Sequence, residues 1–89
     1  MSRNVLTRLD VLPSDVNINL EELLNKIASV LPEGVRIQKH EIVPIAFSLS
    51  ALRLYLILKD EEGGTEKVER AIRGLDEVDE VTLGPSTLI

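Results

Sequence analysis

The chain has 89 residues, of which 44% are hydrophobic, and its formal net charge at pH 7 is -5. This length fits one domain, residues 1–89, with a small core. An acidic balance argues against direct nucleic-acid binding, because affinity for the phosphate backbone comes from clustered Lys and Arg. The sequence contains no Cys, which excludes disulfides and thiolate metal sites. We recognise no signal peptide and no membrane span, so we expect a cytoplasmic protein without membrane contact.

The first half of the chain predicts a strand, a helix and a second strand. Residues 5–12 alternate between inward and outward positions, a period typical of a strand. Asn19 is a good cap for a helix in which Leu and Ile recur at helical spacing. The segment Val35–Ile45 reads as an impure strand, since Lys39 and Glu41 fall on the face expected to be inward. Charges in that position favour the edge of a sheet.

The second half repeats the same kind of unit. Four leucines alternate along residues 52–59, which predicts a central strand covered by helices. Thr65 is expected to cap a second helix, and Gly74 to end it. Val81 and Leu83 mark a short last strand, followed by a tail. The order strand, helix, strand, strand, helix, strand predicts an α+β, ferredoxin-like βαββαβ sandwich, with two helices on one face of a four-stranded antiparallel sheet.

An apolar stretch, Val43–Leu52, lies between the two middle strands of this prediction. Pro44 cannot donate to a sheet ladder, and Ser48 and Ser50 interrupt the apolar run, so we expect a link rather than a strand. The stretch carries Phe47, the only Phe in the sequence. Two interpretations of this side chain stay open: it closes one end of the core, or it projects as an anchor for a protein partner.

The sequence offers no catalytic constellation. His40 is the only His and has no nucleophile beside it. The carboxylates of Asp60–Glu62 are typical of a solvated turn, and residues 63–65 lack the spacing and the Lys of a phosphate-binding loop. The loop 12–15 has neither the Arg nor the glycines of an acylphosphatase-type site. We therefore expect no enzymatic activity, no cofactor and no bound metal.

The segment Val43–Leu54 resembles the corresponding part of archaeal translation elongation factor 1-beta. Residues 60–65, residues 12–14 and the ending in Leu-Ile are similar to that family as well. The resemblance covers essentially the whole chain, with the same order of elements. It implies a guanine-nucleotide exchange factor that promotes replacement of GDP by GTP on the GTPase elongation factor 1-alpha during polypeptide elongation.

The resemblance also implies where the partner binds. The aromatic residue that matches Phe47 enters a pocket on the GTPase, and neighbouring residues shape the loop around it. The C-terminal residues act near the nucleotide, although Leu88 stands where eukaryotic relatives carry a Lys. The expected partner-binding residues are Phe47, Ile45, Ser48, Leu49, Thr87, Leu88 and Ile89.

One alternative function remains open at the level of the sequence. Ferredoxin-like domains also serve as regulatory modules that pair through sheets or helices and bind a small molecule between them. That alternative predicts a stable homodimer, whereas we expect the exchange factor to be a monomer when free.

Overall fold

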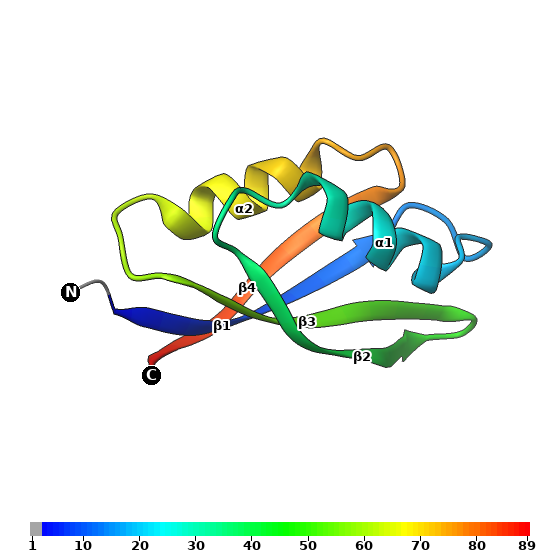
Figure 1. Cartoon of the computed structure of the whole chain (residues 1–89). Helices are drawn as coiled ribbons and strands as arrows, with labels where there is room; N and C mark the ends of the chain where they lie inside the picture. Colours follow the sequence, from blue (N-terminus) through cyan, green and yellow to red (C-terminus); the bar gives the residue numbers. More distant parts are fainter. Residues whose placement is uncertain (1–2) are drawn as a thin grey trace.

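The computed structural model describes residues 3–89, and its elements follow the predicted order (Figure 1). They are β1 (Asn4–Pro13), α1 (Leu20–Val30), β2 (Arg36–Ala46), β3 (Leu49–Lys59), α2 (Gly64–Arg73) and β4 (Val78–Leu88). The strands form one antiparallel sheet in the order β2-β3-β1-β4. Both helices cover the same face of this sheet (Figure 1). The ferredoxin-like α+β fold is confirmed. Within residues 3–89, no helix is long and apolar enough to cross a bilayer.

The core lies between the sheet and the two helices. Alternate residues of the central strands β1 and β3 point toward the helices, as their period of two predicts. Thr7 is the buried polar residue of this layer, and its Oγ1 lies 2.9 Å from Ser86 Oγ of the neighbouring strand. The buried apolar residues are Leu9, Val11, Leu23, Ile27, Leu52, Leu54, Leu56, Leu58, Val68, Ile72 and Val81.

The two helices begin differently. Asn19 caps α1 as predicted, because its side-chain oxygen accepts hydrogen bonds from the amides of Glu21 and Glu22. The prediction that Thr65 caps α2 is wrong. Gly63, at φ 77°, turns the chain into the helix two residues earlier, so that Thr65 is the second residue of α2. Gly74 follows the last residue of α2, as expected.

The expectation that Val43–Leu52 is a link outside the strands is also wrong. Strand β2 continues to Ala46 and β3 begins at Leu49, so the turn consists of Phe47 and Ser48 alone. β2 is an edge strand with a partner on one side only, and such a strand tolerates Pro44. The segment is therefore a tight β-hairpin, which holds its tip much more firmly than a free loop would.

A bulge in β2 explains the charges that the sequence placed on its inner face. Ile37 lies opposite a core leucine of β3, whereas Lys39 lies opposite Tyr55 on the other face, so that Gln38 is an extra residue. Lys39 and Glu41 consequently point to the open face of the sheet. There Lys39 Nζ lies 5.1 Å from the centre of the Tyr55 ring.

The last strand is longer than predicted. β4 runs through Gly84 and Pro85 and includes most of the expected tail, which pairs with β1. Opposite Arg8, β4 has one residue more than β1, which forms a bulge. Pairing resumes beyond Pro85. After the strand ends, the Ile89 amide still donates a hydrogen bond to the Asn4 carbonyl, at 3.0 Å. The C-terminus is therefore held against the sheet.

Candidate partner-binding site

Phe47 projects fully into solvent at the tip of the β2–β3 hairpin. Its relative exposure is 101%, which rules out the interpretation that it closes the core. Ser48 sits beside it with a positive φ of 59°, and Ile45, at a second bulge of β2, is 52% exposed. Leu49 is half-buried at the start of β3. The fold thus presents Phe47 on a short two-stranded support, and its role as an anchor stays a prediction.

The predicted tail residues lie at the other end of the molecule. Leu88 pairs with Val5, and Val5 pairs with Leu58 near the end of β3, whereas Leu49 is at its start. The nine residue-to-residue steps from Leu49 to Leu58 span about 30 Å at ~3.3 Å per step. The structure therefore divides the seven predicted residues into two groups, at the two ends of a molecule 45 Å long (Figure 1).

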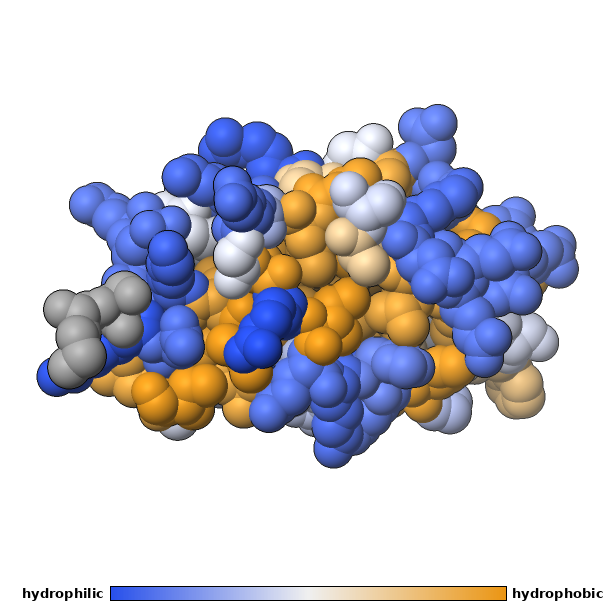
Figure 2. All heavy atoms as spheres, viewed as in Figure 1, coloured by the Kyte–Doolittle hydropathy of each residue, from blue (hydrophilic) through white to orange (hydrophobic). Residues whose placement is uncertain are grey.

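Exposed apolar side chains follow the same division. In Figure 2, an apolar group is visible at the lower left, close to the C-terminus, and apolar surface crosses the middle of the view between polar rims. Near the C-terminus the exposed large apolar residues are Leu88 and Ile89, with Leu83 farther along β4. The other four belong to the opposite half and are Val16, Ile42, Ile45 and Phe47.

A groove adjoins the hairpin tip. It lies between the start of β3 and the loop of residues 14–19 that connects β1 to α1, and its volume is about 120 Å³. We call it the hairpin groove, and its lining residues are Pro13, Val16, Ile18, Leu20, Ser48, Leu49 and Ser50. Val16 was not among the residues predicted to bind a partner. The available signal was an apolar residue between Asp15 and Asn17, in a loop whose only other apolar residue is Ile18.

The face of the sheet that the helices leave open carries charged side chains. Arg53 Nε lies 2.9 Å from one carboxylate oxygen of Asp10 on the adjacent strand, and Nη2 lies 3.3 Å from the other. This hydrogen bonding raises the pKa of the Arg53 guanidinium above its ordinary value. Arg8 and Tyr55 lie opposite each other in the next row. Cross-strand pairs of this kind stabilise the sheet between the two ends.

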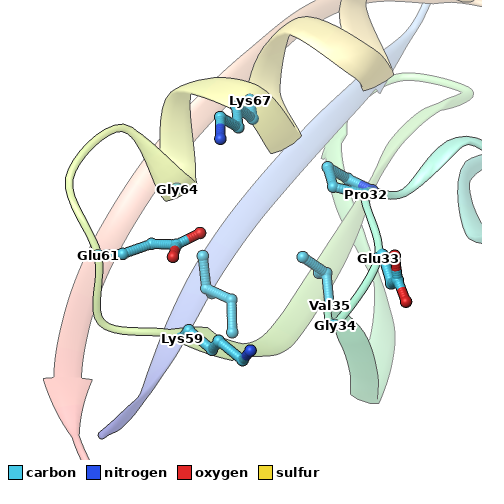
Figure 3. Close-up of a pocket in the computed structure, with 9 residues that line it drawn as sticks. Pro32, Glu33, Gly34, Val35, Lys59, Glu61, Gly64 and Lys67 are labelled. Carbon is cyan, nitrogen blue, oxygen red and sulfur yellow. The ribbon is translucent and has the colours of Figure 1, made fainter. Parts of the chain in front are cut away.

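The turn before α2 does not form a phosphate cradle. Its pocket has a volume of about 30 Å³, room for one or two waters at most. Figure 3 shows the Glu61 side chain beneath Gly64, at the place an anion would occupy. The Gly64 amide already donates to the Glu61 carbonyl, at 3.3 Å. Within residues 3–89, no three His, Asp or Glu side chains gather as a possible metal site.

Comparison with known proteins agrees with this architecture. The profile of the family described as the EF-1 guanine nucleotide exchange domain matches residues 6–84. Elongation factor 1-beta of Staphylothermus marinus is 51% identical over 78 residues, which cover 86% of this chain and 87% of the relative. The proteins of the same name from Hyperthermus butylicus and Ignicoccus hospitalis are 46% and 41% identical; the matches cover 86% and 89% of this chain and 85% of each relative.

The family match includes the hairpin and ends at Gly84. Phe47 therefore lies inside the matched region, whereas Thr87, Leu88 and Ile89 lie beyond it. The match extends over all six elements of the fold except the last residues of β4 and the first residues of β1. The chain belongs to the EF-1 guanine nucleotide exchange domain family.

Proposed function

We propose that this chain promotes the exchange of GDP for GTP on elongation factor 1-alpha by docking the two ends of its sheet on that GTPase. The exchange activity follows from the family. The observation that supports the docking is Phe47, which stands fully exposed at the tip of a firmly paired hairpin. We place this exchange in the cytoplasm, where translation elongation takes place.

An exchange factor of this kind breaks no covalent bond. It binds the nucleotide-free GTPase more tightly than the GDP-bound form, and by linkage it weakens GDP binding by the same factor. A coupling free energy of ~1–3 kcal/mol corresponds to a factor of ~5–150. What such a protein needs is a rigid surface of the right shape rather than reactive groups. A hairpin with few rotatable parts at its tip supplies one, because little ordering entropy is lost on docking.

The distance between the two ends of the sheet determines which parts of the GTPase the chain can contact at the same time. A sheet that spans about 30 Å between Leu49 and Leu58 can contact two separate parts of one GTPase. In this proposal Phe47 holds the complex, while Thr87, Leu88 and Ile89 reach the region of the nucleotide. Leu88 is apolar, so the tail would disturb that region by its bulk rather than by its charge.

Reciprocal binding tests the exchange function. The protein is mixed with its cognate elongation factor 1-alpha, stripped of nucleotide, and the mixture is separated by gel filtration. We expect a stable complex that dissociates when GDP is added in excess, together with faster GDP release when the chain is added to the GDP-bound GTPase. If GDP release stays at the intrinsic rate and no nucleotide-sensitive complex forms, the proposed function is wrong.

A further inference from the structure

We infer that the open face of the sheet binds an acidic segment of a partner polypeptide, with Arg8 and Arg36 as the residues that pair with its carboxylates. The open face is the side of the sheet that the two helices do not cover (Figure 1). This binding goes beyond the exchange function and depends on neither the hairpin tip nor the C-terminal tail. It rests on the distribution of charge over the sheet and on which of those charges already have partners.

The open face is the basic side of an acidic chain. The whole sequence has 10 Lys and Arg against 15 Asp and Glu. The strand pairing places half of the cations on the open face but only a fifth of the carboxylates. The rest of the molecule therefore holds most of the negative charge, so an acidic partner is drawn to the open face. The cations of this face are Arg8, Arg36, Lys39, Arg53 and Lys59, and its paired strand positions hold the carboxylates Asp10, Glu41 and Glu80.

Internal ion pairs neutralise only part of this positive charge. Arg53 binds Asp10, and Lys39 Nζ lies 3.1 Å from a carboxylate oxygen of Glu41. Within residues 3–89, the ion pairs include neither Arg8 nor Arg36. Glu80, the carboxylate left over, lies opposite Leu12, four residues or ~13 Å along β1 from Arg8. The two arginines are therefore cations without a carboxylate of their own.

Arg8 lies at the centre of the proposed site, on the inner strand β1. Its side chain passes so close to Gly84 that a Cβ atom there would lie 2.7 Å from Arg8 Nε. Nε is buried and has no hydrogen-bond partner among residues 3–89. A guanidinium that folding has already stripped of part of its water loses less hydration when it binds an anion. It can then form the charge-assisted, two-pronged hydrogen bonds that arginine makes with a carboxylate.

Single-stranded RNA is a poorer occupant of the same face. Proteins bind unpaired bases by stacking them on aromatic side chains. Tyr55 is the one aromatic residue on the open face, and Lys39 Nζ lies 5.1 Å from the centre of its ring, where it takes up the position of a stacked base. Asp10 and Glu41, on either side of Arg53, would repel a continuous row of phosphates. An acidic polypeptide can place carboxylates at the two free arginines and uncharged residues elsewhere.

A second copy of this chain also fits poorly. If two open faces met, each would offer the other one unpaired carboxylate, Glu80, for the unpaired cations Arg8, Arg36 and Lys59. Most of the positive charge would then face positive charge, which opposes association.

A titration followed by NMR tests the site. The 15N-labelled protein is titrated at low salt with a peptide of about 12 residues in which Glu and Ser alternate, so that its carboxylates lie on one side of the extended chain. We expect the largest shifts of backbone amide resonances around Arg8 and Arg36, and weaker binding at higher salt.

Two substitutions measure the contribution of each arginine. Arg8→Gln and Arg36→Gln should each raise the Kd of the peptide by ~3-fold, the effect expected from the loss of one partly exposed ion pair. The two residues are two strands and one pair of residues apart, about 12 Å between backbones. At that distance their effects should add, so the double variant should bind ~10-fold more weakly than the parent. Arg70→Gln is the matched control, since it changes the net charge equally on the exposed side of α2, and its Kd should stay within ~1.5-fold of the parent.

Thermal unfolding first establishes that the variants are folded; if Arg8→Gln is not, Arg36→Gln decides. The inference is wrong if the peptide causes no shifts at low salt, or if Arg70→Gln weakens binding as much as the open-face variants. It is also wrong if a peptide of alternating Lys and Ser binds as tightly at the same residues. Tighter binding of an oligouridylate of the same length would make the open face a nucleic-acid surface and would likewise overturn the inference.

Discussion

Phe47, the only Phe of the chain, is exposed to water and contributes nothing to the core. Burying a side chain of this size is worth ~1.5–3 kcal/mol relative to leaving it exposed. The free protein does not gain this free energy of burial. It is gained when the hairpin tip enters a pocket on a partner and Phe47 is buried there. A fully exposed Phe on a rigid turn is therefore better explained by binding than by folding.

Among the glycines, Gly84 has the least room for a side chain. A Cβ atom built there would lie 2.7 Å from Arg8 Nε and 3.1 Å from the Arg8 carbonyl oxygen of the adjacent strand. The Arg8 backbone is fixed by its pairing in β1, so it cannot easily withdraw. We expect Gly84→Ala to lower the free energy of unfolding by ~1–3 kcal/mol, measured by urea denaturation.

Gly74 supplies the matched control for this substitution. A Cβ at Gly74 would have its nearest neighbour at 3.4 Å, and the residue has helical angles of φ -70° and ψ -11°. Gly74→Ala should leave stability unchanged or raise it by up to ~1 kcal/mol, because Ala lowers the entropy of the unfolded chain. Equal effects of the two substitutions would contradict the close approach of Arg8 to Gly84.

At the scale of the elements, the β2–β3 hairpin depends on the conformation of Ser48. Its φ of 59° lies in the left-handed region, which β-branched residues strongly disfavour. Ser48→Val should therefore lower the free energy of unfolding by ~1–2 kcal/mol. Ser48→Asn, which tolerates this region, should stay within ~0.5 kcal/mol of the parent. Thermal unfolding of both variants measures the difference, and a Val variant as stable as the Asn variant would argue against this turn.

An ion pair between Lys26 and Glu77 joins α1 to the segment between α2 and β4. Their hydrogen bond lowers the pKa of Glu77 below 4.5 and raises the pKa of Lys26 above 10.5. The pair therefore stabilises the fold between these two pH values. The contribution is lost at the acid side as the pH falls through the lowered pKa of Glu77, and at the alkaline side as it rises through the raised pKa of Lys26.

Lys26→Met removes this ion pair and so tests the predicted pH dependence of stability. The variant should have a slightly lower urea midpoint than the parent at neutral pH, with the difference shrinking as the pH falls through the lowered pKa of Glu77. Denaturation curves at neutral and at strongly acidic pH measure it. A difference of the same size at both would show that Lys26 stabilises the fold through its packing and not through its charge.

The order and type of the elements could be predicted because each depends on a local pattern. Asn19 marked the start of α1, and alternating leucines marked β3. The extent of the hairpin and of β4 could not, because both depend on the place of each strand in the sheet. Pro44 is tolerated because β2 lies at the edge of the sheet, and Pro85 is tolerated because it lies in a bulge of β4 opposite β1. Neither condition can be inferred from the residues next to each proline.

The candidate site was predictable in part for the same reason. A lone Phe in an apolar stretch indicated the hairpin end, although the sequence left open whether Phe47 was buried. The hairpin groove could not be predicted, because it forms where the loop of residues 14–19 meets the start of β3, at least 30 positions away. Only the register of β1 against β3 brings the two together.

For the molecule as a whole, the main feature is a 45 Å body with apolar groups at its two ends. The edges of its sheet are poorly suited to pairing with a second copy. β2 contains Pro44 and two register shifts, and β4 contains Pro85 and two more. Such irregularities protect edge strands from association. They fit the expectation of a free monomer and weigh against the alternative of a regulatory module that dimerises through its sheet.

The C-terminal end offers a separate prediction. Leu88 is 53% exposed and held by pairing with Val5, so its side chain can change without loss of the strand. Leu88→Asp should slow GDP release at saturating exchange factor by ~10-fold or more, because the tail would act by apolar bulk. Asn25→Asp, which adds the same charge to the exposed side of α1, should leave the rate unchanged. Equal rates for Leu88→Asp and the parent would remove the tail from the mechanism.

The central claim is that the exposed hairpin tip holds the GTPase. The most direct measurement is the rate of GDP release from elongation factor 1-alpha as a function of exchange-factor concentration, for the parent and for Phe47→Ala. Because Phe47 makes no contribution to the core, the variant should unfold at the same temperature as the parent. Its half-saturating concentration should rise by ~30-fold or more, which corresponds to the ~2 kcal/mol typical of an anchoring aromatic. A folded Phe47→Ala variant that exchanges GDP at the parent's concentrations and rates would contradict the account.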